Sequence, residues 1–212
     1  MEASFWTEAW DKRHIGFHNA DVHPLLAQHF TALKLPAGAR VFVPLCGKSL
    51  DMAWLLAQGY RVAGCELVET AVAEFFTEMD VTPRITDSGV LKTYRADNIE
   101  IYVGDIFDLG AAVLGDVDAV YDRAALVAFP PDMRARYAPH VRDITQNAPQ
   151  LLITFDYDPA EMDGPPFYVS DADVTTYYGK AYQQTILENV PLDGGLRGGV
   201  KASEVVRCLH DG

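Results

Sequence analysis

Between residues 40 and 155 the sequence alternates between short β-rich runs and amphipathic runs with helical spacing, and no other feature limits the possible folds as strongly. Residues such as Pro44 and Gly59 separate these runs and set their ends. The expected strands are residues 40–43, 60–67, 91–95, 99–103, 117–121 and 151–155, and the expected helices are residues 49–58, 69–79 and 131–145. Strands that alternate with helices predict an α/β fold with a largely parallel sheet covered by helices on both faces.

The two ends of the chain differ from this pattern. We expect helices at residues 4–13, 24–33 and 170–178, a loop at residues 15–24, and strands at residues 184–190 and 204–209. Ser170 and Asp173 have the spacing of a capping box at the start of the last helix. The two closing strands predict an antiparallel edge of the sheet. Because no internal repeat or linker-like stretch divides the chain, we expect a single domain over residues 1–212.

Composition excludes several classes of function. The formal net charge is −13, whereas a nucleic-acid partner normally requires a basic surface, so no nucleic acid is expected as a partner. No apolar run approaches the roughly 20 residues of a membrane helix, so no membrane partner is expected, and residues 1–10 lack the features of a signal peptide. The three cysteines form no CxxC pair, which favours a reducing, cytoplasmic location.

The loop after the first expected strand, PLCGKS at residues 44–49, is the first place where this fold could hold a ligand. A P-loop needs a glycine at position 42, where this chain has Phe42, and a dinucleotide fingerprint needs three glycines, where only Gly47 is present. The remaining reading is a nucleoside cofactor without a pyrophosphate, held by the backbone around Leu45. A nicotinamide-dependent oxidoreductase on a Rossmann-like fold stays open as the alternative.

Charged residues follow three further strands at the same edge of the sheet. Glu66 ends the second strand, where a carboxylate can accept hydrogen bonds from both ribose hydroxyls of a nucleotide. Asp105 and Ile106 follow the third strand of the parallel series, and a polar–apolar pair there suits an adenine ring. Arg123 ends the fourth, beside the expected reaction centre. His14 and His18 are four residues apart, but Gly16 between them disfavours a helix, so no metal site is expected.

Motifs spread over residues 5–178 occur together in one enzyme family. They are FW followed by Trp10, IGFH at residues 15–18, VPLCGKSLD at 43–51, GCEL at 64–67, GDIF at 104–107, YDRAAL at 121–126, ITFDY at 153–157 and MDGPPF at 162–167. On these residues the chain resembles the bacterial thiopurine S-methyltransferases, which are class I S-adenosylmethionine-dependent methyltransferases. The PLCGKSLD and DRAALVA stretches are the most specific of these matches.

The resemblance implies a fold and a reaction. The fold is a Rossmann-like, mostly parallel sheet of the seven-stranded type with helices on both faces, an antiparallel C-terminal edge and an N-terminal helical cap at about residues 1–35 over the cofactor site. The reaction is methyl transfer from S-adenosyl-L-methionine, which becomes S-adenosyl-L-homocysteine, to a small thiol such as a thiopurine. Selenium or tellurium compounds are further acceptors associated with the family. The resemblance also implies a cytoplasmic monomer.

The resemblance assigns roles to particular residues. The cofactor contacts it implies are Trp10, Leu45, Glu66, Asp105, Ile106 and Arg123. Arg123 also orients the acceptor, and Phe17 and Arg197 are candidate substrate contacts; the glycine-rich stretch around Arg197 departs from the family pattern. No general base is assigned, because a thiopurine reaches its thiolate near neutral pH. Asp122 and Asp156 are interpreted as structural acids at strand ends.

Overall fold

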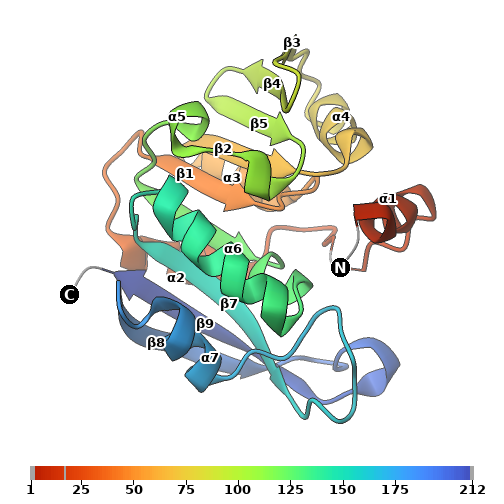
Figure 1. The fold of residues 1–212 in the computed structure, drawn as a ribbon, viewed down its shortest axis with the longest axis vertical. Coiled ribbons are helices and arrows are strands. Elements are labelled where there is room, and N and C mark those ends of the chain that lie inside the picture. Colours follow the sequence, from red (N-terminus) through yellow and green to blue (C-terminus); the bar gives the residue numbers. More distant parts are fainter. Residues whose placement is uncertain (1–2, 17, 211–212) are drawn as a thin grey trace.

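The computed structural model describes residues 3–16 and 18–210, which form one nine-stranded sheet with helices on both faces (Figure 1). The strand order is β3-β4-β5-β2-β1-β6-β7-β9-β8. The strands are β1 (Arg40–Pro44), β2 (Arg61–Glu66), β3 (Arg84–Asp87), β4 (Lys92–Ala96), β5 (Ile99–Val103), β6 (Ala119–Arg123), β7 (Gln150–Tyr157), β8 (Gln183–Pro191) and β9 (Ala202–His210). The expected α/β fold class is therefore confirmed.

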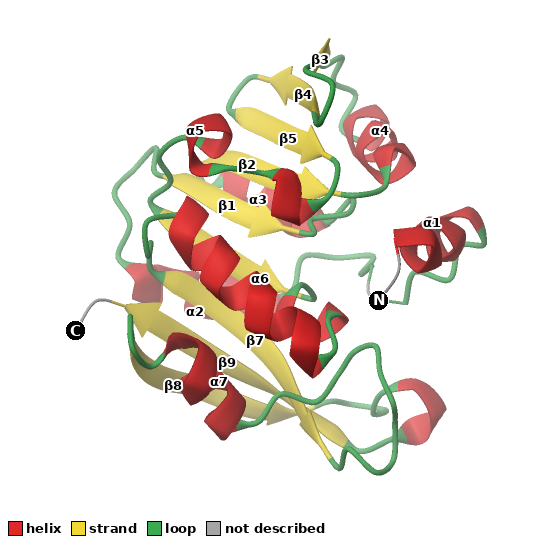
Figure 2. Ribbon diagram, in the orientation of Figure 1, coloured by secondary structure: helices red, strands yellow, loops and turns green. Residues whose placement is uncertain are grey.

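The helices cover the sheet in two groups. They are α1 (Ala3–Asp11), α2 (Pro24–His29), α3 (Leu50–Ala57), α4 (Glu69–Glu78), α5 (Ala111–Leu114), α6 (Pro131–Ile144) and α7 (Asp171–Tyr178), with 3-10 turns η1 (Phe30–Leu33), η2 (Ile106–Asp108), η3 (Leu126–Ala128) and η4 (Arg197–Gly199). Residues of α5, α6 and α7 pack in the hydrophobic core on one face, and residues of α2, η1, α3 and α4 pack in the core on the other (Figure 2).

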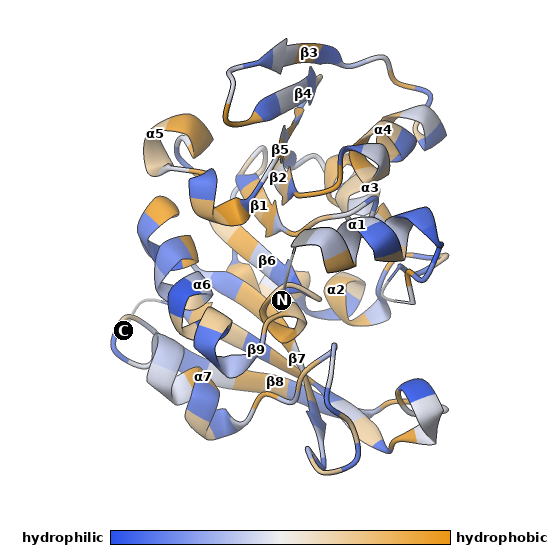
Figure 3. Cartoon of the chain, turned by 45° about the vertical axis from the view of Figure 1, so that its right-hand side comes forward, coloured by the Kyte–Doolittle hydropathy of each residue, from blue (hydrophilic) through white to orange (hydrophobic). Residues whose placement is uncertain are grey.

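Side-chain alternation along the central strands builds both cores at once. On β1, Phe42 belongs to the core under α6, whereas Val41 and Val43 belong to the core under α3. This is the period of two that an extended strand imposes. In Figure 3 hydrophobic residues are concentrated in central strands such as β1, while the edge strand β3 is coloured mainly as hydrophilic.

The sheet differs in two respects from the seven-stranded, mostly parallel sheet that we expected. The strands β5, β2, β1, β6 and β7 pair in parallel, but both edges are antiparallel: β8 with β9 at one edge, as expected, and β3 with β4 at the other. The described sheet therefore has nine strands, seven of which form the expected core. β3 was not predicted, because all four of its residues are exposed and no apolar alternation marks them.

Helix ends agree with the sequence signals where a specific cap exists. Ser170 and Asp173 form the expected capping box of α7, and Ser49 caps α3 through its hydroxyl. The helix expected over residues 24–33 is instead α2 followed by the 3-10 turn η1, which ends at Lys34 with a left-handed backbone. Among the described helices, none is both long and apolar enough to cross a lipid bilayer.

Asp122, on β6, is a fully buried carboxyl group that ties the sheet to α6. Its Oδ1 accepts the backbone N–H of Leu126 at 3.0 Å, and its Oδ2 accepts the hydroxyl of Tyr137 at 2.7 Å. Burial raises the pKa of Asp122 from 3.8 to about 6, because desolvation of the carboxylate outweighs these hydrogen bonds. These contacts fit the structural role that we expected for Asp122.

We expect Asp122 to stabilise the fold less as the pH rises. Its pKa in the folded state lies above its unfolded value, so its contribution is fully present below 3.8 and is lost as the pH rises through about 6. A shift of about two units corresponds to about 3 kcal/mol. Urea unfolding should therefore show the wild type losing about 2–3 kcal/mol relative to Asp122→Asn between about pH 4 and pH 7.

The exposed acid Asp156 supplies the control for this measurement. Asp156→Asn removes a strand-end carboxylate from solvent and should leave the wild-type pH dependence in place. A difference between wild type and Asp122→Asn that stays constant or grows with pH would contradict the effect of burial.

Candidate functional site

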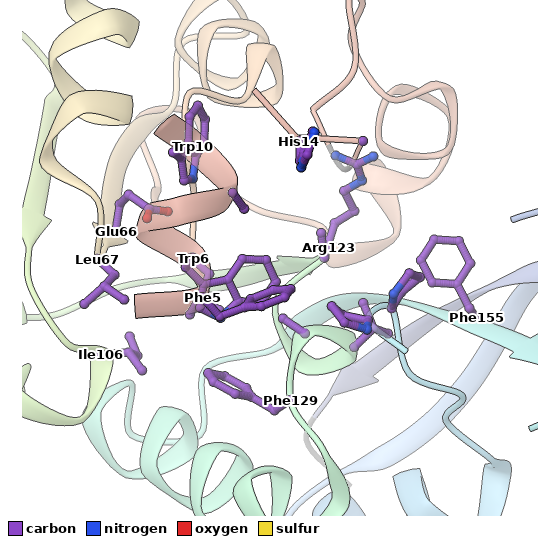
Figure 4. Close-up of a pocket in the computed structure, with 18 of the residues that line it drawn as sticks. Phe5, Trp6, Trp10, His14, Glu66, Leu67, Ile106, Arg123, Phe129 and Phe155 are labelled. Carbon is purple, nitrogen blue, oxygen red and sulfur yellow. The ribbon is translucent and has the colours of Figure 1, made fainter. Parts of the chain in front are cut away.

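A cavity of about 850 Å³ lies beyond the carboxyl ends of β1, β2, β5 and β6 (Figure 4). Its volume is within the range of about 300–1,000 Å³ that small-molecule sites occupy. From β1 the chain runs outward through β2 to β5, and then returns to place β6 on the other side of β1. The cavity therefore lies at the topological switch point of the sheet, which is where open α/β folds bind ligands.

The cavity has two ends of different character. In Figure 4, Glu66, Leu67 and Ile106 lie at one end, Arg123 and Phe155 lie at the other, and Phe5 and Trp6 of α1 lie between them. Apolar side chains from other segments also line the cavity: Phe129, Met133, Pro165, Pro166, Leu192 and Leu196. The cavity therefore fits a polar molecule at one end with a flat apolar molecule beside it at the other.

Glu66 provides a buried acceptor at the polar end. Its side chain is 7% exposed, and its Oε2 and Oε1 accept the backbone N–H groups of Gly47 and Val68, both at 2.8 Å. Burial raises the pKa of Glu66, and these amides oppose that shift without overcoming it. Because a carboxylate has about four acceptor positions, Glu66 retains capacity for two more donors. Two vicinal ribose hydroxyls supply that number.

Two residues with strained backbones border the cavity directly after strands. Leu45 follows β1 with φ of 48°, and Ala124 follows β6 with φ of 63°. A left-handed backbone at a residue with a Cβ costs of order 1 kcal/mol and is concentrated at functional sites. These left-handed residues change the direction of the chain at the ends of β1 and β6, and Leu45 and Arg123 both line the cavity.

The helix α1 closes the cavity near Glu66 through Trp10. Trp10 is 4% exposed and packs with Val68 and Ala71 at the start of α4. A Cβ at Gly47, where φ is 51°, would lie 3.1 Å from the indole ring, so the loop after β1 approaches Trp10 as closely as glycine permits.

An ionic cluster fixes the segment that follows α1 to the body of the protein. Nη1 of Arg13 lies 2.7 Å from Oε2 of Glu74 on α4, and Nζ of Lys48 lies 3.0 Å from the same oxygen. Lys48 also contacts Glu78 at 2.5 Å. The hydrogen bond from Arg13, with the nearby Lys48, lowers the pKa of Glu74 to about 2. The cluster thereby links the loop after α1 and the loop after β1 to one helix.

Asp105 and Ile106, which follow β5, both line the cavity but differ in exposure. Asp105 is exposed and its Oδ1 accepts the N–H of Phe107 at 3.0 Å, which caps η2. Ile106 is 4% exposed, and its carbonyl oxygen contacts Nε2 of His140 at 2.7 Å. Phe107 completes this wall beneath the guanidinium of Arg136, which lies 4.6 Å from the ring centre.

The structure brings together almost every residue that sequence reasoning selected. The selected residues that line this cavity are Trp10, Leu45, Glu66, Asp105, Ile106, Arg123 and Arg197, of which Arg197, in η4, is exposed. Phe17 lies outside the described residues. Two further polar residues of the cavity, His23 and Glu204, were missed, because the contact joins residues 181 positions apart and no local motif marks it.

Comparisons with known proteins identify the family of the chain. The profile of the family described as thiopurine S-methyltransferase matches residues 1–204. The chain is 50% identical to the thiopurine S-methyltransferase of Gluconobacter oxydans over 96% of this chain and 93% of that protein. It is 49% identical to that of Xanthobacter autotrophicus over 99% of each chain.

Solved structures of low sequence identity share the fold. A Burkholderia thailandensis 1,6-didemethyltoxoflavin N1-methyltransferase with bound S-adenosylhomocysteine superposes with a TM-score of 0.66, at 16% identity, over 99% of this chain and 87% of that one. A Synechocystis magnesium protoporphyrin IX methyltransferase with bound S-adenosylhomocysteine gives 0.65, at 13% identity, over 99% and 100%.

The alternative of a nicotinamide-dependent oxidoreductase finds no support in these matches. Family profile and curated relatives instead agree with the resemblance that the sequence motifs carry. The chain belongs to the thiopurine S-methyltransferase family and is an S-adenosylmethionine-dependent methyltransferase.

Proposed function

We propose that this methyltransferase methylates the sulfur of a small aromatic thiol, with a thiopurine as its best acceptor. The observation that carries the proposal is the division of the cavity. A buried carboxylate with spare acceptor capacity lies at one end, a cationic side chain lies at the other with Phe155, and Phe5 and Trp6 lie between them. The name shared by the curated relatives supports the same acceptor class.

The residues at the polar end fit S-adenosylmethionine. Glu66 would accept hydrogen bonds from the ribose, Leu45 would meet the amino-acid part through its backbone, and Trp10 would cover the cofactor. Asp105 and Ile106 would hold the adenine edge and face. When bound, the cofactor supplies a methyl group on a sulfonium leaving group, so the protein mainly contributes position and electrostatics.

Arg123 would work at the boundary between cofactor and acceptor. A guanidinium stays charged and donates in a planar fork, so it favours the thiolate form of an acceptor and orients a flat ring beside it. Phe17 and Arg197 are proposed as further substrate contacts, and selenium or tellurium compounds as further acceptors. We also propose a cytoplasmic monomer of one domain, in which about residues 1–35 form a cap over the cofactor.

Methyl transfer from labelled S-adenosylmethionine to 6-mercaptopurine tests this proposal directly. Mass spectrometry should detect 6-methylmercaptopurine that forms only with enzyme, cofactor and thiol together. Calorimetry with S-adenosylhomocysteine on the same preparation shows whether the cofactor site is intact. Enzyme that binds the homocysteine product but methylates neither 6-mercaptopurine nor simple aromatic thiols would rule out the proposed acceptor class.

A further inference from the structure

His23 and Glu204 form a buried polar pair in the wall of the cavity. His23 lies just before α2 and is 4% exposed, and its Nε2 lies 3.0 Å from Oε1 of Glu204 on β9. Both residues line the cavity. The other ring nitrogen of His23, Nδ1, is buried, and the part of the chain that the structure describes offers it no hydrogen-bond partner.

The contact with Glu204 determines which ring nitrogen carries the proton. A carboxylate can only accept, so the neutral imidazole donates to Glu204 from Nε2. Nδ1 then carries a lone pair. A buried polar atom without a partner costs about 1–3 kcal/mol and calls for an explanation, such as a role toward a ligand. A proton held by an acceptor molecule in the cavity would satisfy Nδ1.

Charged and polar groups surround the loop that carries His23. Asp51 of α3 holds the loop, since its Oδ1 accepts the backbone N–H of His23 at 2.8 Å and its Oδ2 accepts the hydroxyl of Tyr121 at 2.9 Å. Burial raises the pKa of Tyr121 well above its ordinary value; Asp51 and Glu204 add to the rise, and Arg123 opposes it. Tyr121 therefore lies close enough to Glu204, Asp51 and Arg123 for their charges to affect its pKa.

Other titratable groups that line the cavity are less suited to take a proton. Arg123 cannot accept one. Asp105 is exposed against η2, and Glu66, at the end of the cavity opposite Arg123, already accepts the backbone N–H groups of Gly47 and Val68. Glu8, Lys12 and His14 of the N-terminal segment are all exposed. His23 combines burial, a lone pair and an oriented carboxylate, which is the arrangement of an effective general base.

We propose that His23, oriented by Glu204, accepts the proton of the acceptor thiol during methyl transfer. This inference rests on the proposed function. The S–H bond breaks and its proton goes to Nδ1, while the sulfur electron pair forms the bond to the methyl carbon. The bond between methyl and sulfonium breaks, and its electron pair stays on the departing thioether sulfur. Glu204 stabilises the imidazolium until the proton passes to solvent.

The pH dependence of His23→Gln separates this role from a structural one. A glutamine amide can still donate to Glu204 but offers no basic nitrogen. At about pH 7, where an ordinary imidazole is largely neutral and an ordinary thiol is still protonated, we expect kcat for 6-mercaptopurine to fall about 100-fold. Above about pH 9, where the acceptor enters as thiolate, the variant should come within about threefold of wild type. Glu204→Gln should show the same trend with a smaller loss.

His29 provides a matched control. It lies on α2, and its Nε2 contacts Glu188 at 2.5 Å, but it does not line the cavity. His29→Gln should keep the wild-type rate at every pH, and all variants should bind S-adenosylhomocysteine as the wild type does. A His23→Gln defect of equal size at all pH values, or one shared by His29→Gln, overturns the inference. A wild type that methylates no thiol overturns the proposed function and the inference with it.

Discussion

Glu66→Ala should raise the dissociation constant of S-adenosylhomocysteine by about 100-fold to 10,000-fold. The expectation follows from two hydrogen bonds to a charged acceptor, each worth about 1.5–3 kcal/mol. Both would be lost, and no neighbouring side chain replaces them, because the carboxylate is enclosed by the backbone of Gly47 and Val68. Isothermal titration calorimetry on purified wild type and variant measures the change.

A second consequence of this substitution concerns the loop after β1. The carboxylate of Glu66 holds the N–H of Gly47, and Gly47 lies against Trp10. Removing the carboxylate therefore loosens both the loop at Gly47 and its contact with Trp10. The loss of affinity should exceed that caused by removing a surface contact. Glu66→Gln keeps the side-chain size but sets an NH₂ group against one of the two backbone donors, and we expect it to lose nearly as much affinity.

Glu69→Ala is the control for both variants. Glu69 begins α4 three positions later, binds Lys92 at 2.7 Å and the hydroxyl of Tyr94 at 2.8 Å, and does not line the cavity. Its removal should leave the affinity within about twofold of wild type. Unchanged affinity in Glu66→Ala, with a native circular dichroism spectrum, would remove Glu66 from the site.

The sequence was sufficient to predict that Leu45, Glu66 and Ile106 lie at one edge of the sheet, because the signals are local and the geometry is general. Leu45, Glu66 and Ile106 each stand at or just beyond the carboxyl end of a strand, and such ends meet at one edge of a parallel sheet. Residues that follow different strands in the sequence therefore lie close together in the structure. The capping box at Ser170 succeeded for a similar reason, since its donors and acceptors lie within one helical turn.

The features that sequence reasoning missed depend on pairings between distant segments or on surfaces without a pattern. The contact of His23 with Glu204 requires β9 to lie beside β7, and nothing near either residue encodes that. β3 contains Arg84, Ile85, Thr86 and Asp87, all exposed, so its strand state comes from pairing with β4. The cluster of Arg13, Lys48 and Glu74 likewise joins three separate segments.

Arg123 is expected to affect turnover more than cofactor binding. It ends β6 at the end of the cavity opposite Glu66, and the following residue, Ala124, has the left-handed backbone that turns the chain there. A guanidinium strengthens its attraction as negative charge develops on the acceptor, so its contribution is largest at the reacting centre. Arg123→Ala should lower kcat/KM for 6-mercaptopurine by about 100-fold.

Comparison of two substitutions distinguishes the fork geometry of Arg123 from its charge. Arg123→Lys keeps the charge but supplies a point donor in place of a planar fork, so it should recover part of the rate and not all of it.

Calorimetry should show that S-adenosylhomocysteine binds to Arg123→Ala with a loss of affinity of no more than about tenfold, because Glu66 and Trp10 remain. Arg95→Ala, on β4 and paired with Glu100 at 2.7 Å, is remote from the cavity and should behave as wild type. An unchanged rate in Arg123→Ala, or a loss of cofactor affinity as large as the loss of turnover, would show that Arg123 does not act on the acceptor.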